Sequence, residues 1–214
     1  MFIANRMTKH PVTVNPETTL GEAVSIMKKH KFARLPVVED GKLVGLVSDR
    51  ELMRHAPSPA TTLSRYEVRE LLDKLFVRDI MQKEFTTISD DATIEEAALL
   101  MATHNIGGLP VLSSVGNLVG VITEADIFRT FVDVMGLSDG KTRLTIEADD
   151  KVGVLYEISG VFTENGLSID SMVTCKQPNG KYEIVVRGDI PAVDEIKSQI
   201  ETKGYKVVHT VKIG

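Results

Sequence analysis

The sequence predicts a mixed α+β fold, in which a duplicated α/β unit is followed by a smaller domain of the order βαββαβ. Three observations support this prediction. One apolar motif recurs at a constant spacing, each copy contains a helix that begins with a capping box, and the strand pattern changes after residue 140. Self-similarity at a fixed spacing is typical of a repeated structural unit.

The duplicated unit is visible in short motifs that recur 74 residues apart. Met7 corresponds to Met81, and Leu35–Val37 corresponds to Leu109–Val111. A one-residue insertion near Gly116 then changes the spacing to 75 residues. Beyond it, the apolar run 43–45 corresponds to the run 118–120. The chain therefore contains two copies of one unit.

Each copy is expected to fold as strand, helix, strand, strand and helix. The first helices begin at the capping boxes Thr19-x-x-Glu22 and Thr93-x-x-Glu96, in which the threonine hydroxyl satisfies a free amide at the helix start. Two short apolar strands with a Gly-containing turn follow, and a second helix is expected at 49–55 and at 124–134. One such unit leaves an apolar sheet face bare, so we expect the two to pack as a pseudo-two-fold pair.

The domain boundaries are expected at two stretches that favour turns. Residues 56–60, Ala-Pro-Ser-Pro-Ala, break the chain after the first copy, and residues 136–140 contain two glycines. The expected organisation is a first repeat at 1–60, a linker helix at 61–76, a second repeat at 77–134, a linker at 135–140 and a C-terminal domain at 141–214.

The C-terminal domain is expected to have a ferredoxin-like layout. Alternating apolar residues at 144–148 predict a strand, and Gly153–Asn165 predicts a helix. A hairpin is expected from 167–174 and 182–186, joined through Pro178-Asn179-Gly180. A second helix at 191–203 and a closing strand at 205–212 complete the order βαββαβ.

Composition excludes several classes of protein. The net charge of −5 is spread evenly, so no basic body is present and we do not expect nucleic acid as a partner. No stretch approaches the roughly 18 apolar residues of a membrane span, so no membrane association is expected. The single cysteine, Cys175, allows neither an intramolecular disulfide nor a cysteine-based metal site, which favours a cytoplasmic location.

The strongest candidate for ligand binding is the segment Gly120–Asp126. A strand delivers the Thr123 hydroxyl to a helix start, and Asp126 lies one turn later on the same face. A helix N-terminus favours an anionic phosphate, and a carboxylate accepts hydrogen bonds from two ribose hydroxyls. Gly120 permits close approach of a ligand to the backbone. Because Thr-x-x-Asp also has the form of a capping box, a purely structural role remains the alternative.

The first copy contains a related segment in which Ser48 and Glu51 take the same positions. Glutamate is the better capping partner and, being longer, the less suitable ribose ligand. The first copy is therefore the weaker of the two candidate sites.

The duplicated unit resembles the CBS domain, whose tandem pairs form Bateman modules. The family signature Gly-hydrophobic-x-Thr/Ser-x-x-Asp/Asn matches Gly120, Thr123 and Asp126 fully, whereas the first copy departs from it at Glu51. The resemblance implies that AMP, ADP, ATP or S-adenosylmethionine binds between the repeats as a regulatory ligand, with no cofactor required. It also implies an adenine sandwich, which we expect at three apolar residues: Ile88, Ile106 and Pro110.

The C-terminal domain resembles the ACT domain. Asp150, Gly153 and Leu155 match the family's first motif, and Ser168 stands where its second motif usually has asparagine. This resemblance implies an amino-acid site near Asp150, Gly153 and Ser168 at the interface of paired copies. A mainly dimerising role is the alternative. The order CBS–CBS–ACT resembles the acetoin-utilisation regulatory proteins of the AcuB type.

The function expected from the sequence is a regulatory ligand sensor that is not an enzyme. We expect a homodimer that acts on a regulated protein the sequence does not name. The sequence contains no catalytic set of nucleophile and base and no cluster of metal ligands. Two alternatives stay open, namely an assembly factor with vestigial clefts and a weak nucleotide hydrolase.

Overall fold

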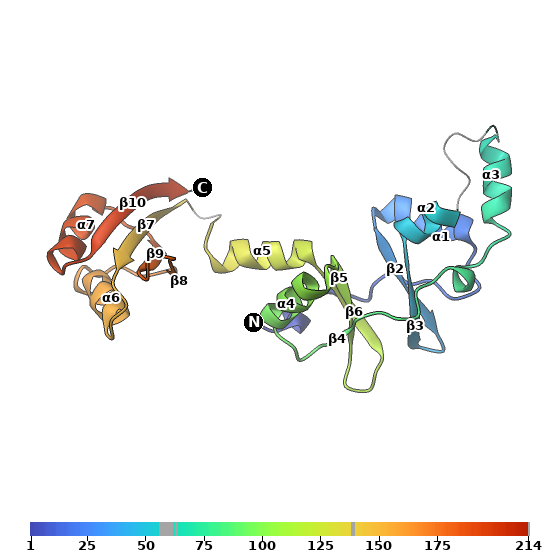
Figure 1. Ribbon diagram of the computed structural model, residues 1–214, viewed down its shortest axis with the longest axis horizontal. Coiled ribbons are helices and arrows are strands. Elements are labelled where there is room, and N and C mark those ends of the chain that lie inside the picture. Colours follow the sequence, from blue (N-terminus) through green and yellow to red (C-terminus); the bar gives the residue numbers. More distant parts are fainter. Residues whose placement is uncertain (56–61, 63, 138–139, 214) are drawn as a thin grey trace. The chain divides into compact units, whose positions relative to one another are not determined.

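The computed structural model describes residues 1–55, 62, 64–137 and 140–213 (Figure 1). It divides into two compact units, Met1–Ile127 and Phe128–Gly214. The expected chain break at 56–60 lies outside the described residues, as do residues 138 and 139 of the expected linker. Both repeats of the duplicated unit belong to the first compact unit, apart from residues 128–134 of the second repeat.

The first repeat contains the expected helix, two strands and second helix, whereas the expected leading strand is only an isolated bridge between Val14 and Val37. Its elements are α1 (Leu20–His30), β2 (Arg34–Glu39), β3 (Lys42–Ser48) and α2 (Asp49–His55). β2 and β3 form an antiparallel two-stranded sheet. The capping box at Thr19 and Glu22 is present at the start of α1, as predicted. The helix α3 (Arg65–Leu72) follows and begins with a further capping box at Ser64 and Glu67.

The second repeat reproduces this order. Its elements are β4 (Ile88–Ser89), α4 (Ile94–His104), β5 (Gly108–Leu112), β6 (Leu118–Thr123) and α5 (Glu124–Val134). The box of Thr93 and Glu96 caps α4, as predicted. β5 pairs with β4 in parallel and with β6 antiparallel. Helix α5 begins in the first compact unit and ends in the second.

The segments that lead into the two repeats are exchanged between them. A 3-10 turn, η1 (Ile3–Asn5), and the short strand β1 (Thr8–Lys9) precede the first repeat in sequence, but β1 pairs with β6 of the second. Conversely, Gln82 follows the turn η2 (Val77–Asp79) and pairs with Leu46 on β3 of the first repeat. Each repeat is therefore completed by the leading segment of the other, which the sequence analysis did not anticipate.

Each repeat has its own aliphatic core, and the exchanged segments contribute to it. Ile3 is buried in the core of the second repeat, together with Leu109 and Ile122. Val77 is buried in the core of the first repeat, together with Leu35 and Val47. Because Ile3 and Val77 are fully buried, we expect the exchange to stabilise both repeats by removing apolar surface from water.

The C-terminal domain has the predicted ferredoxin-like layout. Its elements are β7 (Lys141–Ala148), α6 (Val154–Glu164), β8 (Ser171–Lys176), β9 (Tyr182–Gly188), α7 (Val193–Thr202) and β10 (Lys206–Ile213). The four strands form one sheet in the order β10-β7-β9-β8, with antiparallel pairs throughout. The hairpin turn through Gly180, which has a φ of 83°, is also as predicted. The prediction of a βαββαβ domain is confirmed.

One strand of this domain begins later than predicted. The sequence analysis placed the strand from residue 167, but β8 begins at Ser171. Leu167 and Ile169 pack against the core instead. The reason is the length of the partner strand, because β9 ends at Gly188 and its last pair with β8 joins Arg187 to Ser171.

Candidate functional site

The carboxylate of Asp126 is held at the start of α5 by Thr123. Its Oδ2 atom accepts hydrogen bonds from the Thr123 backbone N–H at 2.9 Å and from the Thr123 hydroxyl at 2.6 Å. The backbone N–H of Asp126 in turn lies 3.4 Å from the Thr123 hydroxyl oxygen. The side chains predicted to bind a ligand are therefore adjacent, and they also form a capping box.

The first repeat contains the same arrangement with an additional contact. Glu51 Oε2 accepts hydrogen bonds from the hydroxyl and from the backbone N–H of Ser48. Its other oxygen, Oε1, accepts from the side-chain amide of Gln82 at 3.0 Å. Gln82 belongs to the exchanged segment beside β3. Both oxygens of Glu51 are therefore used within the protein.

Burial distinguishes these two carboxylates from those of the ordinary capping boxes. Asp126 is 6% exposed and Glu51 is 8% exposed. By contrast, the carboxylates that cap α1, α3 and α4, namely Glu22, Glu67 and Glu96, are exposed. A capping box needs no burial, and desolvating a carboxylate is costly. Burial therefore sets the Thr123–Asp126 and Ser48–Glu51 pairs apart from the ordinary capping boxes of this chain.

Hydrogen bonding overrides burial in setting the pKa of Glu51. Burial alone raises the pKa of this carboxyl, but the hydrogen bonds from Ser48 and from backbone amides favour the charged form. The net result is a pKa below the ordinary value of a glutamate. Glu51 is therefore a buried carboxylate that stays charged at neutral pH.

The glycines that precede the two carboxylates are required by the exchanged segments. A Cβ atom on Gly120 would overlap the Met7 sulfur and lie 3.0 Å from the Thr8 carbonyl oxygen. A Cβ on Gly45 would lie 2.7 Å from the Met81 sulfur. Each glycine thus makes room for the segment that arrives from the other repeat, a packing reason that is separate from close approach of a ligand.

Of the three residues expected to sandwich adenine, the structure places two in one core and the third on another face. Ile88 pairs with Val111 and belongs with Ile106 to the core of the second repeat. Pro110 is buried on the opposite face of β5, where it pairs with Val121. A cavity of about 550 Å³ lies between the 87–92 loop and α4. Ile88 lines this cavity, whereas Asp126, Ile106 and Pro110 are not among its lining residues.

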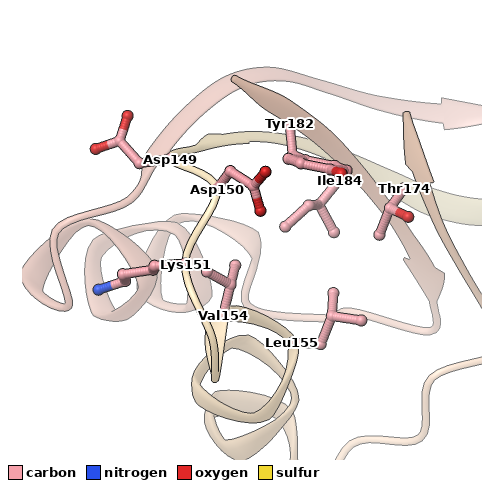
Figure 2. Close-up of a pocket in the computed structure, with 8 residues that line it drawn as sticks. All are labelled: Asp149, Asp150, Lys151, Val154, Leu155, Thr174, Tyr182 and Ile184. Atoms are coloured by element: carbon pink, nitrogen blue, oxygen red, sulfur yellow. The ribbon is translucent and has the colours of Figure 1, made fainter. Parts of the chain in front are cut away.

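A second cavity, of about 150 Å³, lies in the C-terminal domain between the β7–α6 loop and the β8–β9 hairpin (Figure 2). In Figure 2 the Asp150 side chain points toward Tyr182 and Ile184, whereas Asp149 and Lys151 extend away from them. Val154 and Leu155 line the cavity from the start of α6.

The other two residues predicted for this site are not among those that line the cavity. Gly153 is the N-cap of α6 and has a φ of 95°, a backbone conformation that favours glycine. The Ser168 carbonyl oxygen lies only 2.6 Å from where a Cβ on Gly188 would be. Of the three predicted residues, Asp150 alone is placed at the cavity.

Comparison with protein families identifies the repeats. Residues 3–58 and 77–133 match the CBS domain, and together they make up more than half of the chain. The chain belongs to the CBS domain family. Residues 142–204 match the ACT domain, so the tandem CBS repeats are followed by an ACT domain, as the sequence predicted.

Three solved structures are similar to the CBS pair of this chain. The first is a Vibrio cholerae protein assigned to acetoin utilization (AcuB). It is 28% identical to this chain with a TM-score of 0.54, and the alignment covers 65% of this chain and 96% of the Vibrio protein. CBSX2 from Arabidopsis thaliana, in complex with AMP, is 27% identical with a TM-score of 0.52 and is aligned over 62% and 97%. The CBS pair of the protein MJ0100, bound to 5′-methylthioadenosine and S-adenosyl-L-methionine, is 26% identical with a TM-score of 0.51, also over 62% and 97%.

The described residues lack two further features, a metal-binding cluster and a membrane-spanning helix. They contain no group of three or more His, Cys, Asp or Glu side chains placed to hold a metal ion. They also contain no helix with the length and hydropathy that crossing a membrane requires.

Gln82 is the residue at this site that the sequence analysis missed. It follows Met81 directly, and Met81 is the repeat partner of Met7, so the 74-residue spacing already related Gln82 to Thr8. Strand pairing brings Gln82 to Glu51, 31 residues away in sequence. The repeat spacing therefore indicates which residue corresponds to Gln82, but it does not predict the hydrogen bond between Gln82 and Glu51.

Proposed function

We propose that this protein is a non-enzymatic regulatory sensor that binds one adenosine-containing ligand, a nucleotide or S-adenosylmethionine, through Thr123 and Asp126 of the second CBS repeat. Bound AMP in one similar CBS pair and bound S-adenosyl-L-methionine in another support this ligand class. The observation that carries the proposal is the burial of the Asp126 carboxylate, which capping of α5 does not require.

The hydrogen bonds between Thr123 and Asp126 orient the groups that a nucleoside needs. The Thr123 backbone N–H holds Asp126 Oδ2 in place, so little side-chain entropy is lost when ribose hydroxyls donate to the carboxylate. The Thr123 hydroxyl also donates to Oδ2, and it is free to rotate toward a ligand when a ribose hydroxyl replaces it. The amide groups at the start of α5 favour a phosphate.

The first repeat is proposed to bind no nucleotide. Both Glu51 oxygens already accept hydrogen bonds, from Ser48 and from Gln82, and a ribose would have to displace one of these donors. The backbone of Gln82 is held by two hydrogen bonds to the backbone of Leu46, at 2.8 and 3.0 Å, which keep its side chain beside Glu51. We therefore expect one ligand per chain.

Calorimetric titration of AMP, ATP and S-adenosylmethionine tests the proposal. The Asp126→Ala variant should weaken binding by about tenfold to 150-fold, because hydrogen bonds to a charged group contribute about 1.5–3 kcal/mol. Glu22→Ala is the matched control, since it removes the exposed carboxylate of an equivalent capping box on α1. Equal binding by Asp126→Ala and the wild type would refute the ribose contact.

The same titration separates this function from the alternatives. An assembly factor with vestigial clefts would bind none of the three ligands, yet would still bind its protein partner. A nucleotide hydrolase would release phosphate from ATP in the presence of magnesium. Either result would exclude a non-enzymatic sensor of these ligands.

The ACT domain offers a second ligand, because its cavity combines a carboxylate with a helix start. We propose that it binds a small amino acid, whose ammonium group pairs with Asp150 and whose carboxylate meets the amides at the start of α6. In a panel of amino acids, Asp150→Ala should abolish any thermal stabilisation. Asp149→Ala should retain it, because Asp149 also lines the cavity but its carboxylate extends away from Tyr182 and Ile184 (Figure 2).

A further inference from the structure

The two faces of the ACT sheet differ in character. Helices α6 and α7 pack against the face that contains Leu144, Ile146, Ile184 and Val186, which are buried in one core. Because side chains alternate along a strand, the intervening residues of β7 and β9 lie on the opposite face. These are Arg143, Thr145 and Glu147 on β7, and Glu183, Val185 and Arg187 on β9.

Two arginines stand directly opposite each other on this second face. Arg143 pairs with Arg187 across β7 and β9, and Ser171 lies beside Arg187 on β8. Like charges at directly opposite positions of a sheet destabilise it. A pair of arginines at such a position therefore needs compensating negative charge.

Arg143 and its cationic neighbours have that compensation. Arg143 lies 3.6 Å from the Glu183 carboxylate, and its guanidinium also donates to the Thr145 hydroxyl. On the same domain, Lys141 pairs with Asp170 at 3.5 Å and Lys181 with Glu147 at 2.8 Å. Each of these three cations has its own carboxylate.

Arg187 is the exception. Arg187 is only 6% exposed. Its Nε and Nη1 atoms are buried and have no hydrogen-bond partner in the described part of the chain. Burial, and then the charge of Arg143, lower the pKa of Arg187. A buried guanidinium with two unsatisfied donors is costly unless an anion accompanies it.

We propose that Arg187, with Arg143 beside it, forms a binding site for one small oxyanion, a carboxylate or phosphate group, on the face of the ACT sheet opposite the helices. The planar guanidinium presents its donors in the fork that such groups match. One anion would supply a counter-charge, because Glu183 already pairs with Arg143 and no described residue hydrogen-bonds to Nε or Nη1 of Arg187. This site is separate from the cavity at Asp150, which lies on the other side of the sheet with Ile184 and Val154.

The test compares full-length wild type with Arg187→Met in sodium chloride, sodium phosphate and sodium acetate of equal ionic strength. Phosphate or acetate should raise the unfolding temperature of the wild type in a saturable way. Arg187→Met should show no such response, and calorimetric binding of the effective anion should weaken at least about tenfold. Lys181→Met is the control, because Lys181 already has Glu147 as its partner, and it should respond as the wild type does.

Stability in chloride alone separates a binding site from a structural arginine. Removing a buried, unpaired charge should leave Arg187→Met as stable as the wild type or more stable, whereas a structural arginine would lose stability on substitution. Arg187→Lys keeps the charge but not the planar fork, and it should bind the anion more weakly than the wild type. It provides a second test in case the methionine variant does not fold.

Three results would overturn the proposal. The first is a wild-type response to phosphate and acetate no larger than the response to chloride. The second is an undiminished anion response in both Arg187 variants. The third is a dimer, seen by sedimentation, that depends on Arg187 and is indifferent to both anions, because the counter-charge would then be a protein carboxylate from a second copy.

Discussion

The two CBS repeats hold nearly the same carboxylate beside different residues of the exchanged segments. In the first repeat, the two oxygens of Glu51 are divided between Ser48 and Gln82. In the second, the backbone N–H and the hydroxyl of Thr123 both donate to Asp126 Oδ2. The repeat partner of Gln82 is Thr8, which is shorter and exposed. The exchanged segment thus contributes a side-chain amide to the carboxylate of the first repeat, whereas the second repeat has a threonine at the corresponding position.

Exchanging the residues that differ should exchange the two sites, and this is the largest effect we expect. The pair Asp126→Glu and Thr8→Gln gives the second repeat the carboxylate and the exchanged-segment residue of the first. Nucleotide binding should then fall at least about tenfold. The opposite pair, Glu51→Asp with Gln82→Thr, should raise the stoichiometry from one ligand per chain to two. Calorimetry measures both quantities in one titration.

The single substitutions show which residue controls occupation. If Gln82→Thr alone adds a second ligand, displacement of the amide is the deciding factor. If Glu51→Asp is also required, the length of the carboxylate side chain matters as well. An Asp126→Glu/Thr8→Gln variant that binds as tightly as the wild type would contradict the comparison.

The repeats should respond alike where their packing is alike. Gly120→Ala and Gly45→Ala each bring a Cβ against a methionine sulfur and a backbone carbonyl, at 3.0 Å from Thr8 and 3.1 Å from Gln82. Overpacking of this kind destabilises by about 1–3 kcal/mol. Hydrogen exchange measured by mass spectrometry should show faster exchange in the peptides of the repeat that carries the change, with a larger effect for Gly120→Ala, whose sulfur contact is closer.

Gly160→Ala is the control with the opposite sign. Gly160 lies within α6, and a Cβ added there meets no atom within 4 Å. Alanine in a helix is more stable than glycine by roughly 0.8–1.0 kcal/mol, so this variant should slow exchange in α6. Destabilisation by Gly160→Ala as large as that by Gly120→Ala would show that the exchanged segments are not the reason for Gly45 and Gly120.

Much of the fold was predictable because its signals are local. The capping boxes at Thr19 and Thr93, the β2–β3 and β5–β6 hairpins and the order of the ACT domain each depend on residues that are close in sequence. The pairing of β1 with β6 was not predictable in this way, because a two-residue strand has no periodicity to detect. The same holds for the buried, unpartnered state of Arg187, which alternation along β9 does not reveal.

The site was predicted as a set of residues but not as an arrangement. Thr123 and Asp126 adjoin because they are three positions apart at the start of a helix, a spacing that can be read from the sequence. Whether their carboxylate is buried depends on what covers it, and the Glu51–Gln82 contact joins residues 31 apart through the exchanged segment. Sequence spacing defines contacts along one helix, whereas burial and contacts between segments follow from tertiary packing.

The smallest effect we expect concerns acid, and it applies to the first repeat. The pKa of Glu51 is lowered in the folded protein, so its charged form stabilises the fold above the ordinary pKa of a glutamate, about 4.5. This stabilisation is lost as the pH falls through the lowered folded pKa.

Glu51→Gln removes the titrating group, so hydrogen exchange in residues 46–55 should depend less on pH below about 4.5 than in the wild type. Glu67→Gln is the control, because the pKa of Glu67 is also lowered but its side chain is exposed at the start of α3. It should leave the acid response of residues 46–55 unchanged, and an equal change in both variants would mean that the buried contacts of Glu51 contribute nothing of their own.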